Sequence, residues 1–303
     1  MNLLGLGEAA ALGTALCWSA SAVFFTFGSR GVGSVVLNRT RLLVALTLLS
    51  LLHTAAFGAP LPLGAEGQRW LWLGLSGVVG LAIGDAFLFQ AYVWIGARLT
   101  MLVMSAVPVI SAGLAWAVLG ERLGATQWAG VALTVGGIAA VVSERPAVSA
   151  GQAAVSPDLR RGLLFALGAA VGQAGGLILA RQGLGGDFPA LSGNVIRMLC
   201  AAAALWALTL LRGEARATVE RLRAAPRAWL PILGGSFFGP TLGVWLSLLS
   251  IQNTRIGIAS TIMALPPVFL LPIGRWVFGE RVGLRAVAGT LVAIGGVALL
   301  LSA

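Results

Sequence analysis

Long apolar segments separated by short polar stretches run through almost the whole chain. A helix needs ~20 apolar residues to cross the hydrocarbon core of a bilayer, and ten segments of the 303-residue sequence come close to that length or exceed it. Because most of the connections are very short, neighbouring spans are expected to form antiparallel hairpins. The pattern predicts an all-α membrane protein with ten transmembrane helices, at residues 7–27, 34–56, 70–94, 98–119, 126–143, 160–180, 191–211, 228–252, 255–278 and 284–302.

Short motifs of the first half recur 159 positions further along the chain. Residues 119–124 read Leu-Gly-Glu-Arg-Leu-Gly, and residues 278–283 read Phe-Gly-Glu-Arg-Val-Gly. At the same offset Pro108 corresponds to Pro267. A duplicated apolar unit is the sequence mark of many secondary transporters, whose substrate site lies between the two copies.

Each copy holds five of the predicted spans. We expect a first repeat at 1–143, a polar linker at 144–159 and a second repeat at 160–303. Five is an odd number, so the second repeat should enter the membrane from the opposite side and lie inverted relative to the first. Two inverted five-helix repeats around a central cavity are suited to alternating access, because exchanging their conformations opens the cavity to the other side.

Composition places most of the surface in lipid. Hydrophobic residues make up 58% of the chain and charged residues 10%, against about 25% charged residues in soluble domains. The net charge of +10 comes from arginine alone, but the arginines are scattered between apolar runs rather than clustered, so nucleic acid is not an expected partner. One histidine and two separate cysteines give no metal site, and the sequence predicts no catalytic residue and no cofactor.

The distribution of arginines bears on membrane orientation. Fifteen arginines lie nearer the odd-numbered loops and five nearer the even-numbered loops. Cytoplasmic loops carry the excess of basic residues in membrane proteins. The count therefore predicts that both termini lie outside the cytoplasm.

The repeated residues also carry a family resemblance. The chain resembles the EamA repeat of the drug/metabolite transporter superfamily twice, and the two copies together cover nearly all of it. The elements are Gly84-Asp85, Gln90-Ala91, Gly96-Ala97, Pro108, Leu119-Gly120-Glu121-Arg122, Gly130 and Gly136-Gly137 in the first copy, and Gly257-Ile258-Ala259-Ser260, Pro266-Pro267 and Gly279-Glu280-Arg281 in the second.

The resemblance implies a bacterial inner-membrane carrier with ten helices in two inverted halves. Members of the family move amino acids, other metabolites or drugs, often as exporters. Their termini are generally cytoplasmic, which is opposite to the arginine count, so orientation stays open. Arg39 and Arg197 resemble the family's arginines early in the second helix of each half.

Two ionisable residues are the leading candidates for contact with substrate. Asp85 lies well inside the third span, where an ionised carboxylate costs about 2.5–3.5 kcal/mol. It is expected to bind a cationic group, exchange protons, cap a helix break or pair with an arginine; the second copy has Val244 at this position. Arg197 lies six residues into its span and could hold a substrate carboxylate or form a structural ion pair.

Matching prolines predict helix breaks in both halves. Pro108 lies within the fourth span, and Pro266 and Pro267 lie within the ninth. Each removes a backbone donor, and paired breaks are the best sequence indication of a midplane site, although a kink that only shapes the helix is an equal alternative. Ser105 and Thr261 lie near these breaks and could supply hydroxyl groups.

Rings and amides in otherwise apolar spans complete the set of candidates. They are Trp18, Trp245, Gln90 and Gln173. A tryptophan away from the membrane interface needs a partner for its indole N–H, which substrate could supply. Packing against a neighbouring helix is the simpler interpretation for all four.

Transport is the leading functional interpretation. We expect a monomeric secondary transporter in the lipid bilayer that exports a small organic metabolite such as an amino acid. The chain has no lysine and therefore no Walker A motif. A membrane-embedded enzyme or a scaffold without transport activity are the alternatives; the enzyme needs convergent acids or metal ligands that the sequence does not offer.

Overall fold

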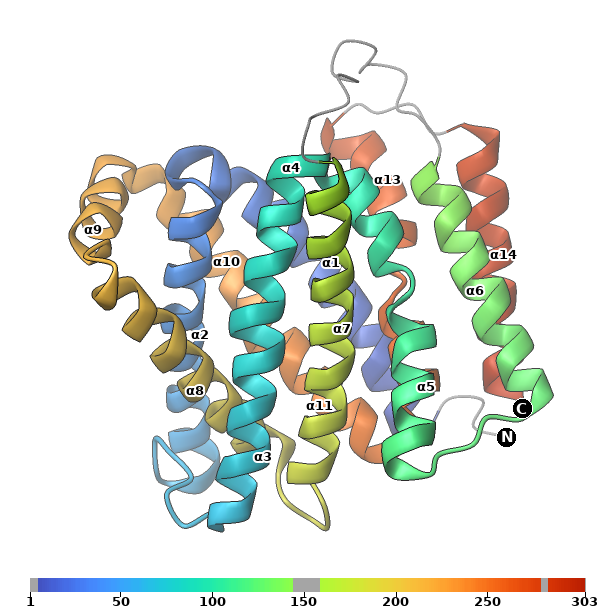
Figure 1. Ribbon diagram of the computed structural model, residues 1–303, viewed down its shortest axis with the longest axis horizontal. Helices are drawn as coiled ribbons and strands as arrows, with labels where there is room; N and C mark the ends of the chain where they lie inside the picture. Colours follow the sequence, from blue (N-terminus) through green and yellow to red (C-terminus); the bar gives the residue numbers. More distant parts are fainter. Residues whose placement is uncertain (1–4, 144–158, 279–282, 303) are drawn as a thin grey trace.

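Helices make up the regular structure of the part of the chain that the computed structural model describes, residues 5–143, 159–278 and 283–302 (Figure 1). The first half contains α1 (Leu6–Val32), α2 (Ser34–Phe57), α3 (Gly67–Gly77), the π-helical segment η1 (Val78–Gly84), α4 (Asp85–Met104), α5 (Val107–Leu119) and α6 (Ala125–Ser143). The second half contains α7 (Leu159–Gly183), α8 (Ala190–Leu211), α9 (Ala215–Ala224), the 3₁₀ turn η2 (Pro226–Ala228), α10 (Trp229–Ser236), the π-helical segment η3 (Phe237–Gly243), α11 (Val244–Asn253), α12 (Ile256–Met263), α13 (Pro266–Phe278) and α14 (Leu284–Ser302).

The helices match a membrane-spanning protein. Among the described residues nine helical stretches are long and apolar enough to cross a bilayer, and Val107–Leu119 is a shorter apolar helix. Large apolar side chains are exposed on the outer helices, for example Leu164 on α7 and Leu291 on α14, where lipid tails can cover them. The predicted all-helical, ten-span architecture is confirmed.

The two halves run in opposite directions through the molecule. In Figure 1 α1 rises from the lower end and α6 ends at the upper end, whereas α7 descends from the upper end and α14 finishes at the lower end. The expected linker and the second Gly-Glu-Arg motif, at 144–158 and 279–281, lie outside the described residues.

Each half packs its first helix against the third span of the other half. α1 lies along α10, η3 and α11, and α7 lies along α3, η1 and α4. The Ser21 hydroxyl on α1 donates to the Gly235 carbonyl at 3.1 Å, and the Ser76 hydroxyl on α3 donates to the Gly176 carbonyl at 2.5 Å. The two bonds occupy equivalent places in the two halves. The serine lies on the first helix in one bond and on the third span in the other. This exchange joins the halves into one bundle.

Glycines hold the last helices of the two halves together. A Cβ added to Gly130 would lie 2.9 Å from the Gly296 carbonyl oxygen, and one added to Gly289 would lie 2.7 Å from the Gly137 carbonyl oxygen. A shift of 159 residues converts each of these contacts into the other. A two-fold pseudosymmetry axis therefore passes between α6 and α14.

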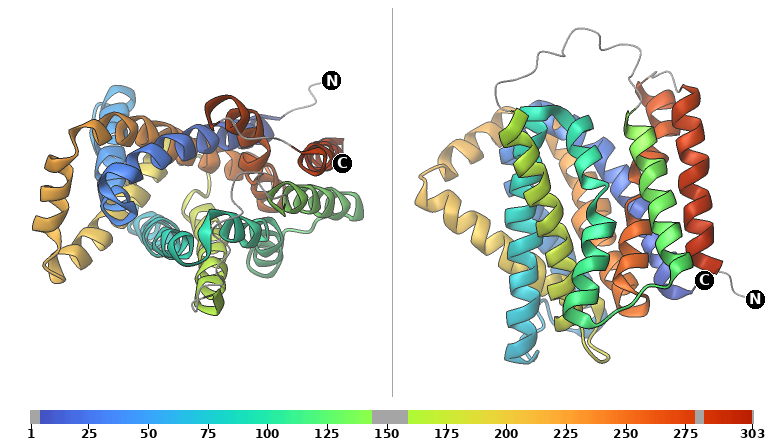
Figure 2. Two further views of the ribbon diagram at one scale, coloured as in Figure 1. Left: turned by 90° about the horizontal axis from the view of Figure 1, so that it is seen from above. Right: turned by 45° about the vertical axis from the view of Figure 1, so that its right-hand side comes forward.

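The structure differs from the predicted spans in two places. α4 is helical through 94–98, where the third span was expected to end, and it bends over the upper end of the molecule before it stops at Met104 (Figure 2). The second half has no such continuous helix, because Thr254 adopts an extended conformation that separates α11 from α12, in agreement with the predicted spans 228–252 and 255–278. The polar segment 212–227, expected as a loop, contains α9, whose short run of helix-favouring residues the apolar pattern could not reveal.

Candidate functional site

Both halves contain a seven-residue π-helical segment in the middle of the third span. η1 covers 78–84 and η3 covers 237–243, again 159 residues apart. A π-helix leaves the regular hydrogen-bond pattern and is frequent at functional sites. Glycine makes up part of both segments, and Pro240 inside η3 also lacks a backbone donor. The two segments therefore place irregular backbone deep inside the bundle.

A second pair of interruptions lies where the prolines were expected to act. Pro108 is in the first turn of α5, and Pro266 and Pro267 open α13. The residues before these helices, at 105–106 and 264–265, are outside any helix. Ser105 is buried beside the first break. The Thr261 hydroxyl donates to the Gly257 carbonyl at 2.6 Å, so its proton is used within α12.

Asp85 begins α4 directly after η1 and forms an ion pair with Arg41 on α2. The Arg41 Nε also donates to the Asn38 Oδ1 at 2.8 Å. Its guanidinium carbon lies 5.8 Å from the centre of the Phe25 ring and 5.3 Å from that of Phe89, distances at which a cation is attracted to an aromatic face. The ion-pair alternative for Asp85 is thus the one that the structure shows.

Arg197 lies on α8, which packs against η1, and is 4% exposed. Its Nε and Nη1 are buried without a hydrogen-bond partner among the residues that the structure describes. The absence of a side chain at Gly80 leaves room for the guanidinium, since a Cβ there would lie 3.6 Å from Nη2, and Gly77 lets η1 and α3 approach the Arg197 backbone. Arg197 attracts Asp85 electrostatically, but Arg41 already pairs with that carboxylate.

Arg41, Asp85 and Arg197 form what we call the charge cluster. Two arginines and one aspartate give it a formal net charge of +1. A buried guanidinium without a counter-charge is costly, and arginines within membrane spans usually pair or mark a substrate path. The cluster is therefore an electrostatically incomplete site beside irregular backbone.

A repeated motif relates Arg41, rather than Arg39, to Arg197. The motif Asn-x-x-Arg occurs at Asn38 to Arg41 and again at Asn194 to Arg197, 156 residues later, so Arg41 is the counterpart. The Asn194 Nδ2 donates to the carbonyls of Pro240 and Thr241 at 3.1 and 3.2 Å. Its Oδ1 has no hydrogen-bond partner. The repeated motif was the signal that could have identified Arg41 from the sequence.

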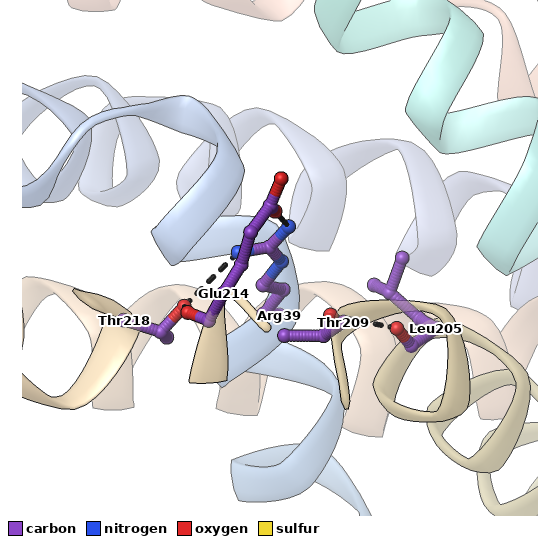
Figure 3. A network of polar contacts seen from close by, with 5 residues as sticks. All are labelled: Arg39, Leu205, Thr209, Glu214 and Thr218. Atoms are coloured by element: carbon purple, nitrogen blue, oxygen red, sulfur yellow. Dashed lines mark hydrogen bonds and ion pairs between the residues drawn. The ribbon is translucent and has the colours of Figure 1, made fainter. Parts of the chain in front are cut away.

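Arg39 belongs to a different polar network at the upper end of the bundle. Figure 3 shows its guanidinium directed at Glu214 and Thr218, with ion-pair and hydrogen-bond contacts that join α2 to α9. The hydrogen bond from Arg39 lowers the pKa of Glu214 below its ordinary value. The Trp206 Nε1 donates to the Arg39 carbonyl at 3.1 Å. This network fastens a surface helix and lies outside the charge cluster.

Trp18 and Gln173 lie at equivalent positions of the two first helices, each against the π segment of the opposite half. A Cβ on Gly243 would lie 2.8 Å from the Trp18 Nε1, and one on Gly84 would lie 3.6 Å from the Gln173 backbone nitrogen. The structure thus brings Gln173 beside the start of α4 and Trp18 beside the start of α11.

The other two candidates lie on the helices that follow the π segments. Trp245 follows η3 and is half-buried against the apolar cluster formed by α2, η1 and α8. Gln90 is half-buried five residues after Asp85. Neither has a described hydrogen bond that connects it to the charge cluster, so their roles rest on position alone.

Pockets also lie at the lower end of the bundle, apart from the charge cluster. One, of about 440 Å³, is lined by Arg122, Gln127 and Arg255 among others. It lies where the first half meets α12, whose first amide, at Ile256, donates to the Glu121 carboxylate at 2.9 Å. The part of the chain that the structure describes contains no group of three metal-ligating side chains.

The profile of the EamA-like transporter family matches residues 5–143 and 160–302. The chain belongs to the EamA-like transporter family. This EamA-family protein is 32% identical over 230 residues to an uncharacterized protein of Pseudomonas aeruginosa, a match that covers 76% of this chain and 73% of that protein.

The chain is also similar to two proteins over shorter segments and to a solved structure. Two matches are to proteins named probable 4-amino-4-deoxy-L-arabinose-phosphoundecaprenol flippase subunit ArnE. The one from Pseudomonas paraeruginosa is 41% identical over 80 residues, which cover 26% of this chain and 64% of the subunit. The one from Pseudomonas fluorescens is 33% identical over 89 residues, which cover 29% of this chain and 73% of the subunit. A crystal structure superposes with a TM-score of 0.77 over 97% of this chain and 94% of its own at 17% identity, which supports the fold alone. The protein is a multi-span membrane protein of the drug/metabolite transporter type.

Proposed function

We propose that this EamA-family protein is a secondary transporter of a small organic metabolite, such as an amino acid, and that it acts as a monomer and an exporter in the bacterial inner membrane. The observation that carries the proposal is the pairing of helix interruptions. η1 and η3, and the breaks before α5 and α13, occur at matching places in two inverted halves. Paired interruptions of this kind point to a substrate site near the midplane.

Alternating access follows from the way the halves are joined. α1 and α7 each cross to the opposite half, and α6 and α14 meet through glycines at the pseudosymmetry axis. Rocking about this axis exchanges the surroundings of η1 and η3 and so exposes the site between them to one side and then the other. Without a Walker A motif in the chain, the driving force is an ion or substrate gradient.

Asp85 is the proposed coupling residue. Its carboxylate is held by Arg41 and lies at the end of η1, and protonation would release Arg41 to another anion. The equivalent position in the second half is Val244, so coupling would be a property of the first half only.

Flux measurements in proteoliposomes test the proposal. Purified protein is reconstituted and tested with a panel of radiolabelled amino acids and related metabolites, with and without a pH gradient. We expect saturable flux of at least one compound. Asp85→Asn should abolish its dependence on the pH gradient, and an unchanged dependence would remove Asp85 from coupling. Absence of flux for every compound would favour a scaffold.

The names of the shorter relatives favour a second candidate. A flippase of a polyprenyl-linked sugar phosphate would use the same fold, and the arginine-lined pocket at the lower end would suit a phosphate at the membrane surface. Translocation of a fluorescent polyprenyl-phosphate sugar across proteoliposome membranes, measured by protection from a reducing agent, distinguishes this activity from flux of free metabolites.

A further inference from the structure

We infer that Arg197 binds an oxyanion group, a carboxylate or a phosphate, on the transported molecule. The inference rests on the proposed transport function and specifies the substrate class. It follows from three features: the unfilled donors of Arg197, the net charge of its surroundings and the chemistry of the neighbouring side chains.

The donors of Arg197 are available although the side chain is buried. Arg41 divides its donors between Asn38 and Asp85, whereas Nε and Nη1 of Arg197 have no hydrogen-bond partner in the described part of the chain. Guanidinium groups bind carboxylate and phosphate oxygens more strongly than neutral acceptors. One anion at Arg197 would satisfy donors that now raise the free energy of the folded protein.

The net charge of the charge cluster indicates how many anionic groups it binds. The charge cluster has a formal charge of +1, so one monoanionic group makes it neutral. A cationic substrate without an anionic group would raise the charge to +2 in a low-dielectric environment, which is strongly unfavourable. The cluster therefore selects for a carboxylate or phosphate and against simple amines.

The neighbouring groups define the rest of the molecule. Asn194 lies one helical turn before Arg197 and has an unpaired buried Oδ1, which could accept an N–H or O–H next to the anion. Met198, Leu81 and the half-buried Trp245 belong to one apolar cluster beside the site. The fitting substrate has an anionic end with an adjacent donor and an apolar body.

A simpler arrangement is a bond between Arg197 Nε and Asn194 Oδ1, matching the one between Arg41 and Asn38. That bond would leave Nη1 unfilled and the net charge unchanged. It would also make Arg197 important for stability in the absence of any ligand. The two arrangements can be separated by experiment.

Binding is measured by thermal shift of detergent-solubilised full-length protein with three probes of similar shape: benzoate, phenyl phosphate and uncharged benzamide. We expect benzoate or phenyl phosphate, and not benzamide, to stabilise the wild type. Arg197→Gln should weaken that binding about 10- to 100-fold. Arg197→Lys should weaken it less, because it keeps the charge and loses the planar donors. Arg216→Gln, the same change at an exposed position, should bind like the wild type.

The same thermal-shift measurement with a long-chain polyprenyl phosphate in mixed micelles distinguishes binding of a lipid-linked phosphate from binding of a free anion. Stabilisation that depends on Arg197 supports the inference with any of the three anions. No stabilisation by any of them, or equal stabilisation of wild type and Arg197→Gln, overturns it. Flux in proteoliposomes that persists despite this result would leave the transport proposal intact.

Stability without ligand gives an independent readout. Arg197→Gln removes an uncompensated buried charge, so its melting temperature should equal or exceed that of the wild type. A melting temperature clearly below the wild type would assign Arg197 to the structural arrangement and contradict the inference.

Discussion

At the residue scale, the counterpart arginines Arg41 and Arg197 differ in their ion pairing. Within residues 5–143, 159–278 and 283–302, Arg41 has a carboxylate partner and Arg197 has none. The sequence identifies Asp85 and Arg197 as notable because ionisable residues are rare in apolar spans. It could not show that Asp85 pairs with Arg41, since that contact joins residues 44 apart on different helices and depends on how α2 packs against α4.

The ion pair predicts a specific pattern of stabilities. Arg41→Gln leaves the part-buried Asp85 without its partner, and the loss should approach the roughly 3–5 kcal/mol that breaking a fully buried pair costs. The double variant Arg41→Gln/Asp85→Asn removes both charges and should recover most of the loss. Unfolding of the purified variants in detergent measures both effects. Equal destabilisation by the single and double variants would contradict the pairing.

The contact between Arg39 and Glu214 predicts a pH dependence. Because the pKa of Glu214 is lower in the folded protein, its stabilising effect is complete above the ordinary carboxyl pKa of about 4.3 and is lost as the pH falls through the lower, folded-state pKa. The difference in melting temperature between wild type and Glu214→Gln should therefore be constant near neutral pH and shrink in acid. Glu214 is 43% exposed, so the difference should be small and should decrease with salt. A difference that grows in acid would contradict this assignment.

At the element scale, interruptions and glycine contacts matter more than helix length. Pro108 and Pro267 indicate the breaks before α5 and α13 in the sequence, because proline cannot continue the backbone hydrogen bonds. The π segments have no comparable signal: η1 contains only glycine and aliphatic residues, and its geometry depends on α7 and α8 packing against it. The uninterrupted course of α4 through Gly96 was also hidden, because a single glycine weakens a helix without ending it.

Adjacent glycines allow a matched test of the contact between α6 and α14. A Cβ on Gly137 would lie 2.5 Å from atoms of Gly289 and Ala293, whereas one on Gly136 would meet nothing within 4 Å. Gly137→Ala should destabilise the protein by about 1–3 kcal/mol. Gly136→Ala should be neutral or slightly stabilising, because alanine favours the helix. Thermal unfolding of the two variants in detergent compares them, and equal melting temperatures would contradict the close packing.

At the scale of the whole molecule, the duplication in the sequence predicts most of the architecture. The offset of 159 residues between the later motifs of the two halves and the five spans per half are enough to infer inversion. They do not reveal that α1 and α7 exchange partners between halves, because that depends on surfaces of small residues such as Ser21 and Gly176. They also do not determine the membrane orientation. The arginine count predicts that both termini lie outside the cytoplasm, whereas the termini of family members are generally cytoplasmic.

The orientation proposed from the arginine count can be tested by labelling. In a background with Cys17 and Cys200 replaced, Ala217→Cys places a thiol on exposed α9 and Ala125→Cys places one at the opposite end of the bundle (Figure 1). If the arginine-rich end is cytoplasmic, a membrane-impermeant maleimide applied to intact spheroplasts should label Cys at 125 and not at 217. The reverse pattern would show that the termini are cytoplasmic, in line with the family.

In the proposed mechanism, the protein carries a small organic anion through a site formed at the paired interruptions. Counterflow in proteoliposomes tests it most directly: vesicles are loaded with an unlabelled amino acid, and entry of the labelled compound is compared for wild type, Arg197→Gln and Arg216→Gln. We expect counterflow of at least one carboxylate-bearing compound by wild type and Arg216→Gln, and a loss of about tenfold or more in Arg197→Gln. Counterflow that Arg197→Gln leaves unchanged, or none for any compound with wild type, would contradict the claim.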